Sequence, residues 1–406
     1  MGSVGGVPEG QGQPGCGWRG WVSIEEFEKD LQNNLYRIWN RMSSGSYFPP
    51  AVKAVPIPKD GGRGTRILGV PTVGDRIAQT VAAARLEPRV EKIFHTDSDG
   101  YRVGRSAIDA VAKCRQRCWR YDWVIDLDIQ KFFDSCPHDL IVKAVEANTD
   151  APWVLLYVKR WLTAPMQQPD GTLQQRDRGT PQGSAVSPVL ANLFLHYAFD
   201  AWMSREFPAV RFERYVDDAV VHCTSEQQAH QVLAAISNRM AEVGLTLHPT
   251  KTKIVYCRDS NRRGEHDNIS FTFLGYTFRP RAAKNRQGQV FTSFLPAMSR
   301  DKLIDKGRQA HQWRLDRRTN GTLADLAEAI NPIVRGWMNY WGHFYRSQMI
   351  PLLRRINTYL MRWARKKYKR LKGVKRLKAW WAMVVQRAPN LFAHWRWTKE
   401  FLPTGW

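Results

Sequence analysis

The chain has 406 residues, enough for about two or three domains, and its 43% apolar content is ordinary for a globular protein. Its charge is unusual, because 61 Lys and Arg against 37 Asp and Glu leave a formal net charge of +24. Such a charge favours a polyanionic partner. No apolar run of about 18 residues and no signal peptide can be read, which argues against a membrane as that partner.

The chain begins with a Gly-rich segment, residues 1–22, that has little apolar periodicity and is predicted to be disordered. Ser23 opens a capping-box pattern, which predicts an amphipathic helix as far as about Met42. Two strands are expected next, joined by a Gly-rich turn at 60–64, and a helix and a further strand follow them. Their expected ranges are 52–58 and 66–71 for the strands, 76–93 for the helix and 123–129 for the next strand.

The second half of the body alternates in the same way. Helices are predicted at 183–203 and 227–243, and strands at 253–257, 271–278 and 289–294. Between the helices, 211–223 reads as two apolar strands joined by a tight turn. After Ser299 only helices are predicted, so the sequence indicates an α+β body of roughly 280 residues followed by a basic helical region.

The positive charge is concentrated in that last region. From Asp301 onward there are 23 basic and 6 acidic residues, and Pro351–Lys399 contains no acidic residue. Nine of the 17 Trp also follow residue 300. Aromatic rings beside cations suit base stacking together with phosphate neutralisation, although any single Trp here is also explained by core packing.

Six cysteines (16, 114, 118, 136, 223 and 257) form no Cys-x-x-Cys pair and have no spaced His partners. They are therefore interpreted as reduced thiols of a cytosolic protein, and not as a zinc site or a disulfide framework.

Carboxylates at strand ends carry the chemical signal. Asp126 and Asp128 interrupt an apolar strand, and Asp217 and Asp218 occupy the tip of the predicted hairpin. An isolated Asp-Asp pair is commonly a solvated turn. If the strands are neighbours, however, Asp128, Asp217 and Asp218 converge, and such a cluster needs cations to offset its repulsion. Two Mg²⁺ ions would suit phosphoryl transfer, activating an attacking hydroxyl and steadying the leaving oxygen.

These acidic positions lie within a series of motifs that resembles a reverse transcriptase, in particular the intron-encoded reverse transcriptase/maturase of bacterial group II introns. The resemblance runs from about Ser23 to the C-terminus, and the motifs occur in the order of that family. They are Val55–Lys59, Arg66–Arg76, Gly100–Ser106, Asp128–Asp134, Arg178–Pro188, Tyr215–Asp218, Gly244–Thr252 and Phe273–Tyr276. Each motif alone could arise by chance, whereas their ordered occurrence is specific.

The resemblance implies an α+β right-hand polymerase fold, with antiparallel sheets in the palm and fingers and an all-helical thumb/maturase region. The implied fingers are 23–122, the palm 123–295 and the thumb/maturase region 296–372, with a basic aromatic tail at 373–406. Asn331–Trp341 resembles the maturase segment, with Trp337, Tyr340 and Trp341 expected to pack inward. No His/Cys-rich nuclease module follows, which is typical of the endonuclease-lacking type.

The resemblance also assigns roles to residues. Asp128, Asp217 and Asp218 would be catalytic and, with Ile129, would bind two Mg²⁺ ions. The implied nucleotide-binding residues are Lys59, Arg66, Phe133, Gln182 and Lys251, with Phe133 as the steric gate against a ribose 2′-hydroxyl and Lys251 as a donor to the leaving pyrophosphate. The implied primer grip is Leu274, Gly275 and Tyr276. The basic residues expected to contact RNA are Arg335, Arg362, Arg365, Lys366, Lys367, Lys369 and Arg370.

The predicted function is RNA-directed DNA synthesis from a primer 3′-hydroxyl, together with assistance to splicing and mobility of a group II intron. The implied partners are the intron RNA, an RNA template, a DNA primer or target and dNTPs, in a cytoplasmic, nucleoid-associated ribonucleoprotein. One departure is that Gly17–Trp21 stands where the family has a Gly-x-Asp-Gly segment after an N-terminal extension. A splicing cofactor with impaired polymerase activity, or a host-recruited enzyme of repair or phage defence, therefore remain as alternatives.

Overall fold

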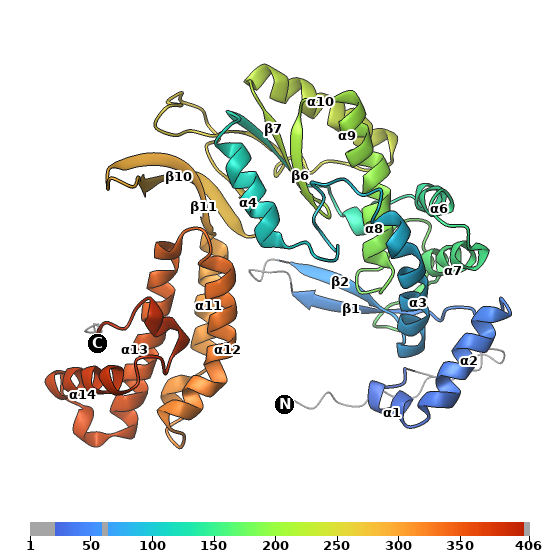
Figure 1. The fold of residues 1–406 in the computed structure, drawn as a ribbon. Coiled ribbons are helices and arrows are strands. Elements are labelled where there is room, and N and C mark those ends of the chain that lie inside the picture. The colour runs from blue at the N-terminus through green and yellow to red at the C-terminus, as the bar shows by residue number, and fades with distance from the viewer. Residues whose placement is uncertain (1–20, 59–63, 402–406) are drawn as a thin grey trace.

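The computed structural model describes residues 21–58 and 64–401; most of the atypical N-terminal segment (residues 1–20) and Lys59 lie outside these ranges. Figure 1 shows three groups of elements: the first helices with the β1–β2 hairpin, a central sheet covered by helices, and a separate set of C-terminal helices. The arrangement is mixed α+β, as the sequence predicted. Among the described residues, no helix is long and apolar enough to cross a membrane.

The N-terminal helix is interrupted. The single helix predicted from Ser23 to about Met42 is instead α1 (Ile24–Glu28) and α2 (Leu31–Ser43). The Ser23 hydroxyl caps α1 by accepting from the main-chain N–H of Glu26 at 3.1 Å. The break is stabilised by Asn34, whose side-chain amide donates to the Phe27 carbonyl at 3.0 Å.

The fingers contain a sheet with strand order β2-β1-β4-β5. The predicted pair is confirmed as β1 (Val52–Pro58) and β2 (Thr65–Val70), antiparallel from Lys53↔Val70 to Pro58↔Thr65. The other strands, β4 (Met166–Gln167) and β5 (Leu173–Gln174), come from the region assigned to the palm, and β4 pairs with β1 in parallel over two residues. Helix α3 (Val73–Val90) begins three residues earlier than predicted, because the Thr72 hydroxyl caps it.

The palm sheet has the order β6-β7-β3-β8, and all of its pairs are antiparallel. The hairpin is β6 (Arg211–Tyr215) and β7 (Asp218–Cys223), as predicted; β3 is Trp123–Leu127 and β8 is Lys253–Tyr256. One face of the sheet packs in a core shared with α10 (Glu226–Glu242) and α8 (Ser187–Leu195). Helix α4 (Ala107–Cys118) covers the opposite face.

Other palm helices were not anticipated or differ in extent. Helices α5 (Phe132–Ser135), α6 (His138–Glu146) and α7 (Pro152–Thr163) follow β3. The helix predicted from 183 begins only at Ser187, and a π-helical turn, η2 (His196–Asp200), leads from α8 into α9 (Ala201–Glu206).

The strand predicted at 271–278 is wrong in one respect, because the chain turns back within it. β9 (Phe271–Phe273) and β10 (Tyr276–Lys284) are antiparallel neighbours, and β11 (Val290–Met298) completes the sheet. Leu274 and Gly275 form the turn with φ angles of 50° and 79°. A Cβ on Gly275 would lie 2.5 Å from the ring of Trp341, so only glycine allows the turn to pack against this tryptophan.

The C-terminal region is helical throughout its described part, as predicted. Its long helices are α11 (Arg300–Gln312), α12 (Leu323–Trp341), α13 (Ile350–Lys367) and α14 (Val374–Arg387). Short 3₁₀ turns connect them: η3 (Leu315–Arg317), η4 (Arg346–Met349), η5 (Lys369–Leu371) and η6 (Ala393–Arg396).

No domain boundary lies at residue 372. Trp381 and Trp395, from the predicted tail, share one core with Trp337 and Trp363 of the preceding helices. Buried Asn357 of α13 accepts hydrogen bonds from His394 at 2.7 Å and from Trp395 at 3.0 Å. The separate tail predicted at 373–406 is therefore wrong for its described residues, because its aromatic side chains complete the thumb core.

Candidate active site

Three carboxylates meet where β3 ends and β7 begins. The antiparallel register pairs Leu127 with Ala219, so Asp128, one residue on, lies beside Asp218, one residue back. Asp217 occupies the turn between β6 and β7, after Val216, whose φ is 61°. The convergence expected from the sequence is thus a consequence of strand pairing. Ile129, also proposed as a metal ligand, turns its side chain into the core and can offer only its main-chain oxygen.

The carboxylates raise one another's pKa values. Desolvation and the neighbouring Asp217 and Asp128 raise the pKa of Asp218 to about 7, although part of its side chain faces solvent. Desolvation and Asp128 also raise the pKa of Asp217. Asp126, two residues before Asp128, behaves similarly: desolvation, with Asp218 and Asp128 contributing, raises its pKa to about 7. This site would favour a bound cation over four uncompensated charges.

The segment after α10 fixes Asp128. The Asp128 carbonyl accepts from the main-chain N–H of His248 at 2.7 Å and from the Thr252 hydroxyl at 3.3 Å. Between them in sequence, Lys251 places its ammonium 2.7 Å from the Asp128 carboxylate. Lys251 therefore lies beside the carboxylates.

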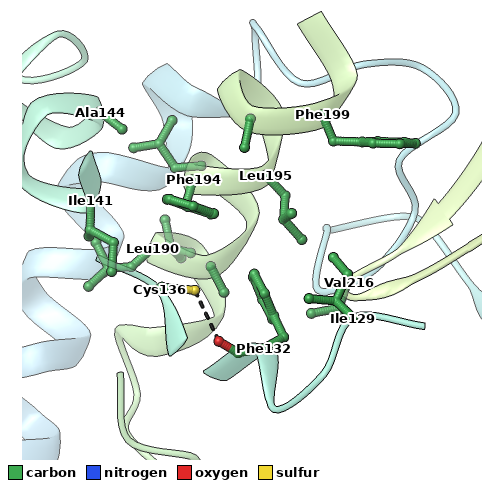
Figure 2. Close-up of a cluster of buried hydrophobic side chains, with 14 of the residues drawn as sticks. Ile129, Phe132, Cys136, Ile141, Ala144, Leu190, Phe194, Leu195, Phe199 and Val216 are labelled. Carbon is green, nitrogen blue, oxygen red and sulfur yellow. Dashed lines mark hydrogen bonds between the residues drawn. The ribbon is translucent and has the colours of Figure 1, made fainter. Parts of the chain in front are cut away.

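A buried network holds the turn that carries Asp217. The Arg214 guanidinium donates to the Val216 carbonyl and the Asn192 side-chain oxygen, both at 3.0 Å, and forms a two-pronged ion pair with buried Asp200. The Asn192 amide in turn donates to the Gly100 carbonyl at 2.5 Å. Figure 2 shows Val216 and Ile129 at the edge of the hydrophobic cluster around Phe194 and Phe199. The turn is thus fixed from both its polar and its apolar side.

The predicted gate, Phe133, is only partly buried, while its neighbour Phe132 is in the core (Figure 2). The Phe133 carbonyl accepts from the main-chain N–H of Thr180 at 2.7 Å, which ties it to the Arg178–Pro188 motif. A Cβ on Gly179 would lie 2.7 Å from the same carbonyl. Close backbone contact therefore joins two motifs that lie far apart in the sequence.

Gln182 joins the palm to the fingers. Its carbonyl accepts from the main-chain N–H of Gly69 in β2 at 2.8 Å. Ser184 and Ala185 both donate to the side-chain oxygen of Gln79, at 2.6 and 2.8 Å. The turn holding Gln182 is therefore anchored to both β2 and α3, and the Gln182 side chain is half-buried.

Two further side chains face the carboxylates from the fingers side. Desolvation is the largest influence on the pKa of Asp217 and raises it, whereas the charge of Arg66 lowers it. The Arg66 guanidinium therefore lies near enough to act on the Asp217 carboxylate. Tyr101 is 58% exposed, adopts a φ of 53°, and has its pKa raised by desolvation and by Asp217. Lys59 lies outside the described residues.

The three residues of the predicted primer grip differ in exposure. Tyr276 is fully buried, and its hydroxyl donates to the Tyr340 carbonyl of α12. The Tyr340 hydroxyl donates to the Leu274 carbonyl at 3.0 Å. Only Leu274 and Gly275 are accessible, so Tyr276 anchors the turn to the thumb.

The basic residues of the helical region also fall into two classes. Arg335, Arg362, Lys369 and Arg370 are exposed, and Arg365 is half-buried. Lys366 instead forms an ion pair with Asp316 at 2.5 Å. Lys367 donates to the carbonyls of Thr319 and Gly321 at 2.9 and 2.5 Å. Lys366 and Lys367, both expected to contact RNA, therefore already have partners within the protein.

Comparison with known families identifies the fold. The family described as reverse transcriptase (RNA-dependent DNA polymerase) matches residues 57–278, more than half of the chain. The chain belongs to the reverse transcriptase family. A second match, to the group II intron maturase-specific domain, covers residues 308–381 and so extends past residue 372.

Similar proteins agree with this assignment. Protein YkfC of Escherichia coli is 29% identical over 61% of this chain and 71% of its own length. The putative COX1/OXI3 intron 1 protein of Saccharomyces cerevisiae is 25% identical over 65% of this chain and 38% of its own. The group II intron-encoded protein LtrA of Lactococcus lactis is 27% identical over 41% of this chain and 27% of its own. The match with this chain therefore spans less than half of the length of each of the two intron proteins.

Sequence reasoning missed the supporting residues of this site. Arg214, Asn192 and Asp200 act through buried contacts between separate helices and strands, and only the adjacency of Arg214 to Tyr215 gave a signal. Tyr101 lay within a quoted motif, Gly100–Ser106, without a role. Asp126 had been noted only as an interruption of a strand. The carboxylate oxygens near it are hard donors that fit a divalent cation, as reverse transcriptases generally use.

We predict that Gly100→Ala impairs polymerisation, because a Cβ there would lie 2.6 Å from both the main-chain nitrogen and a methyl carbon of Val216. The turn holding Asp217 must shift, so kcat should fall by about tenfold or more. Overpacking should lower the free energy of unfolding by about 1–3 kcal/mol. Primer-extension kinetics and urea unfolding measure the two effects. Gly336→Ala, where a Cβ meets nothing within 4 Å, is the control, and equal activity of the two variants would contradict the prediction.

Proposed function

We propose that this reverse transcriptase extends a primer 3′-hydroxyl on an RNA template by two-metal phosphoryl transfer. The observation that carries the proposal is the convergence of Asp128, Asp217 and Asp218, where desolvation and the neighbouring carboxylates raise the pKa values of Asp217 and Asp218. The family match to RNA-dependent DNA polymerases supports the reaction, and a family of divalent-metal enzymes supports Mg²⁺ as the ion.

In this proposal Asp128 and Asp217 hold two Mg²⁺ ions, with Asp218 and the main-chain oxygen of Ile129 completing the site. The bound ions would lower the pKa of the primer hydroxyl and offset charge on the transferring phosphate. The hydrogen bonds of Asp128 and the Arg214 network keep the carboxylates in place before substrate arrives. Such preorganisation is what electrostatic catalysis requires.

The neighbouring residues would position the nucleotide. Arg66, together with Lys59, is proposed to bind the triphosphate, and Gln182 to lie against the nucleotide and template. Phe133 would exclude the 2′-hydroxyl. Lys251, 2.7 Å from Asp128, would donate a proton to the departing pyrophosphate. Leu274 and Gly275 would contact the primer end, with Tyr276 holding the turn against α12.

We further propose that the C-terminal helices bind a group II intron RNA and assist its splicing and mobility. The maturase-domain match and the exposed Arg335, Arg362, Lys369 and Arg370 support this proposal, and Arg365 remains in the proposed set. The RNA template, a DNA primer or target and the intron would be the partners. A cytoplasmic ribonucleoprotein associated with the nucleoid is the proposed setting.

Asp217→Asn should abolish DNA synthesis. The amide keeps the shape of the side chain but loses its charge, so kcat should fall by roughly 10³-fold or more if several kcal/mol of charge stabilisation is lost. Because a repelling carboxylate is removed, metal-free stability should be maintained or increase. The assay is extension of oligo(dT) on poly(rA) with Mg²⁺, alongside thermal unfolding. Exposed Asp267→Asn is the matched control, and wild-type extension by Asp217→Asn would refute the assignment.

Phe133→Ala should admit ribonucleotides by removing the clash with the 2′-hydroxyl. The ratio of kcat/KM for dNTP over rNTP should fall by roughly 10- to 200-fold, corresponding to one steric contact. The control is Phe291→Ala, since Phe291 is 42% exposed on β11. A ratio that stays unchanged in Phe133→Ala, with extension retained, would assign Phe133 to packing alone.

The two classes of basic residue should differ in salt dependence of RNA binding. Lys369→Gln with Arg370→Gln should flatten the log–log slope by about 1.4–1.8 units, because each phosphate contact contributes roughly 0.7–0.9. Lys366→Gln with Lys367→Gln removes the same charge, but these side chains already have protein partners, so the slope should change less. Fluorescence anisotropy across a salt series measures both. Equal slopes for the two double variants would contradict the division of the basic residues into RNA-binding and protein-paired classes.

A further inference from the structure

A cluster of sulfur and nitrogen donors lies beneath the palm sheet, on the face covered by α4. The donor atoms of Cys114 from α4, Glu213 from β6 and His222 from β7 all lie within 4.8 Å of one another. All three side chains are buried. Neither the polymerase site nor the RNA-binding helices account for this cluster.

Two more thiols join it. The Cys118 thiol lies close enough to the side chains of Cys114, Cys257 and His222 for them to shift its pKa. Cys114 and Cys118 are four residues apart, so they share one face of α4, while Cys257 directly follows β8. Three thiols and an imidazole therefore approach one point from a helix and two strands. The side chains of Cys118, Cys257 and His222 are fully buried.

The His222 ring has the orientation of a metal ligand. Its Nε2 hydrogen-bonds the Glu213 carboxylate at 2.6 Å, and the other oxygen of Glu213 accepts from Arg117 at 2.6 Å. Its Nδ1 is buried and has no hydrogen-bond partner that meets normal geometry. Metal-binding histidines typically donate one ring N–H to a carboxylate and present the other nitrogen to the metal.

We propose that Cys114, Cys118, Cys257 and His222 form a structural zinc site, with Glu213 orienting the imidazole. Three thiolates and one imidazole are among the donor sets of closed, four-coordinate zinc sites. The donors of such a site lie about 3.5–3.8 Å apart, given zinc–ligand bonds of roughly 2.0–2.3 Å. The donors of Cys114 and His222, which lie within 4.8 Å of each other, would therefore move closer by up to about 1 Å around the ion.

The protonation of the metal-free cluster fits this role. Burial raises the pKa values of Cys114 and Cys118 to about 12, so these thiols are neutral without a metal. Burial opposes the charged form of His222, but the Glu213 carboxylate raises its pKa to about 10. Each thiol, and Nδ1 of the imidazolium, would release a proton to solvent as its bond to zinc forms. No redox step is involved.

The zinc site would differ from the polymerase site in chemistry and purpose. Thiolate and imidazole donors select zinc, whereas the palm carboxylates suit Mg²⁺. The ion would bond α4 directly to β7 and to the end of β8. β7 begins at Asp218, so the strand that carries one catalytic carboxylate would be fixed at its other end by a metal bond.

The test is zinc content of the full-length protein, purified under reducing conditions and measured by mass spectrometry of the metal. We expect about one zinc per chain that survives removal of Mg²⁺ and is released when a mercurial blocks the thiols. Cobalt substitution should give a thiolate-to-cobalt charge-transfer band and intense tetrahedral visible bands. A wild-type protein that binds neither metal stoichiometrically after reconstitution would overturn the proposal.

Matched variants separate ligands from other buried cysteines. Cys118→Ser and Cys257→Ser should lose zinc and lower thermal stability, and chelation should destabilise the wild type to a similar extent. Cys223→Ser is the control, because Cys223 is a buried residue of β7 next to His222 but packs in the core on the opposite face. Asp217→Asn should keep its zinc. Zinc retained by Cys118→Ser, or lost from Asp217→Asn, would contradict the assignment, and cobalt spectra of the wild type decide the case if a variant fails to fold.

Discussion

Repulsion among carboxylates is the constraint on which the rest of this reverse transcriptase depends. Strand pairing brings Asp128 beside Asp218, and desolvation together with their mutual charge raises the pKa of Asp218 to about 7. A cluster of charged carboxylates is unfavourable without a cation, so the surrounding fold must hold these side chains close together. Hydrogen bonds to the Asp128 carbonyl and the Arg214 contact with Val216 supply that rigidity. The positions of the carboxylates are therefore fixed by contacts within the protein.

Backbone contacts join motifs that are distant in sequence. Thr180 donates to the Phe133 carbonyl, and Gly69 of β2 donates to the Gln182 carbonyl, so main-chain hydrogen bonds connect these segments directly. Glycine is required where these segments touch, as at Gly179, because a side chain would collide with the facing main chain. A change in any of these motifs is thus transmitted to the others through the main chain.

The sequence predicted the elements with strong periodicity, and the carboxylates with them. Apolar segments on both sides of the acidic pair placed Asp217 and Asp218 at a turn between β6 and β7, and β3 placed Asp128 at a strand end. The turn at Leu274–Gly275 was missed because apolar residues continue on both sides of it. The supporting Arg214–Asp200 pair could not be predicted, since it joins a strand to a π-helical turn through buried contacts that have no local pattern. Tertiary packing decided these features, and local propensity did not.

Charge counting misjudged the helical region for a related reason. Composition showed an acid-free run, but its neutralising partners come from elsewhere in the chain: Asp316 pairs with Lys366, and loop carbonyls accept from Lys367. These contacts attach α13 to the segment before α12, so part of the positive charge stabilises the thumb itself. The aromatic residues divide in the same way, because Trp363 and Trp381 are buried while the exposed cations alternate with them. In this region one amphipathic pattern therefore provides both a packed core and a basic surface, and only the side facing solvent is available to RNA.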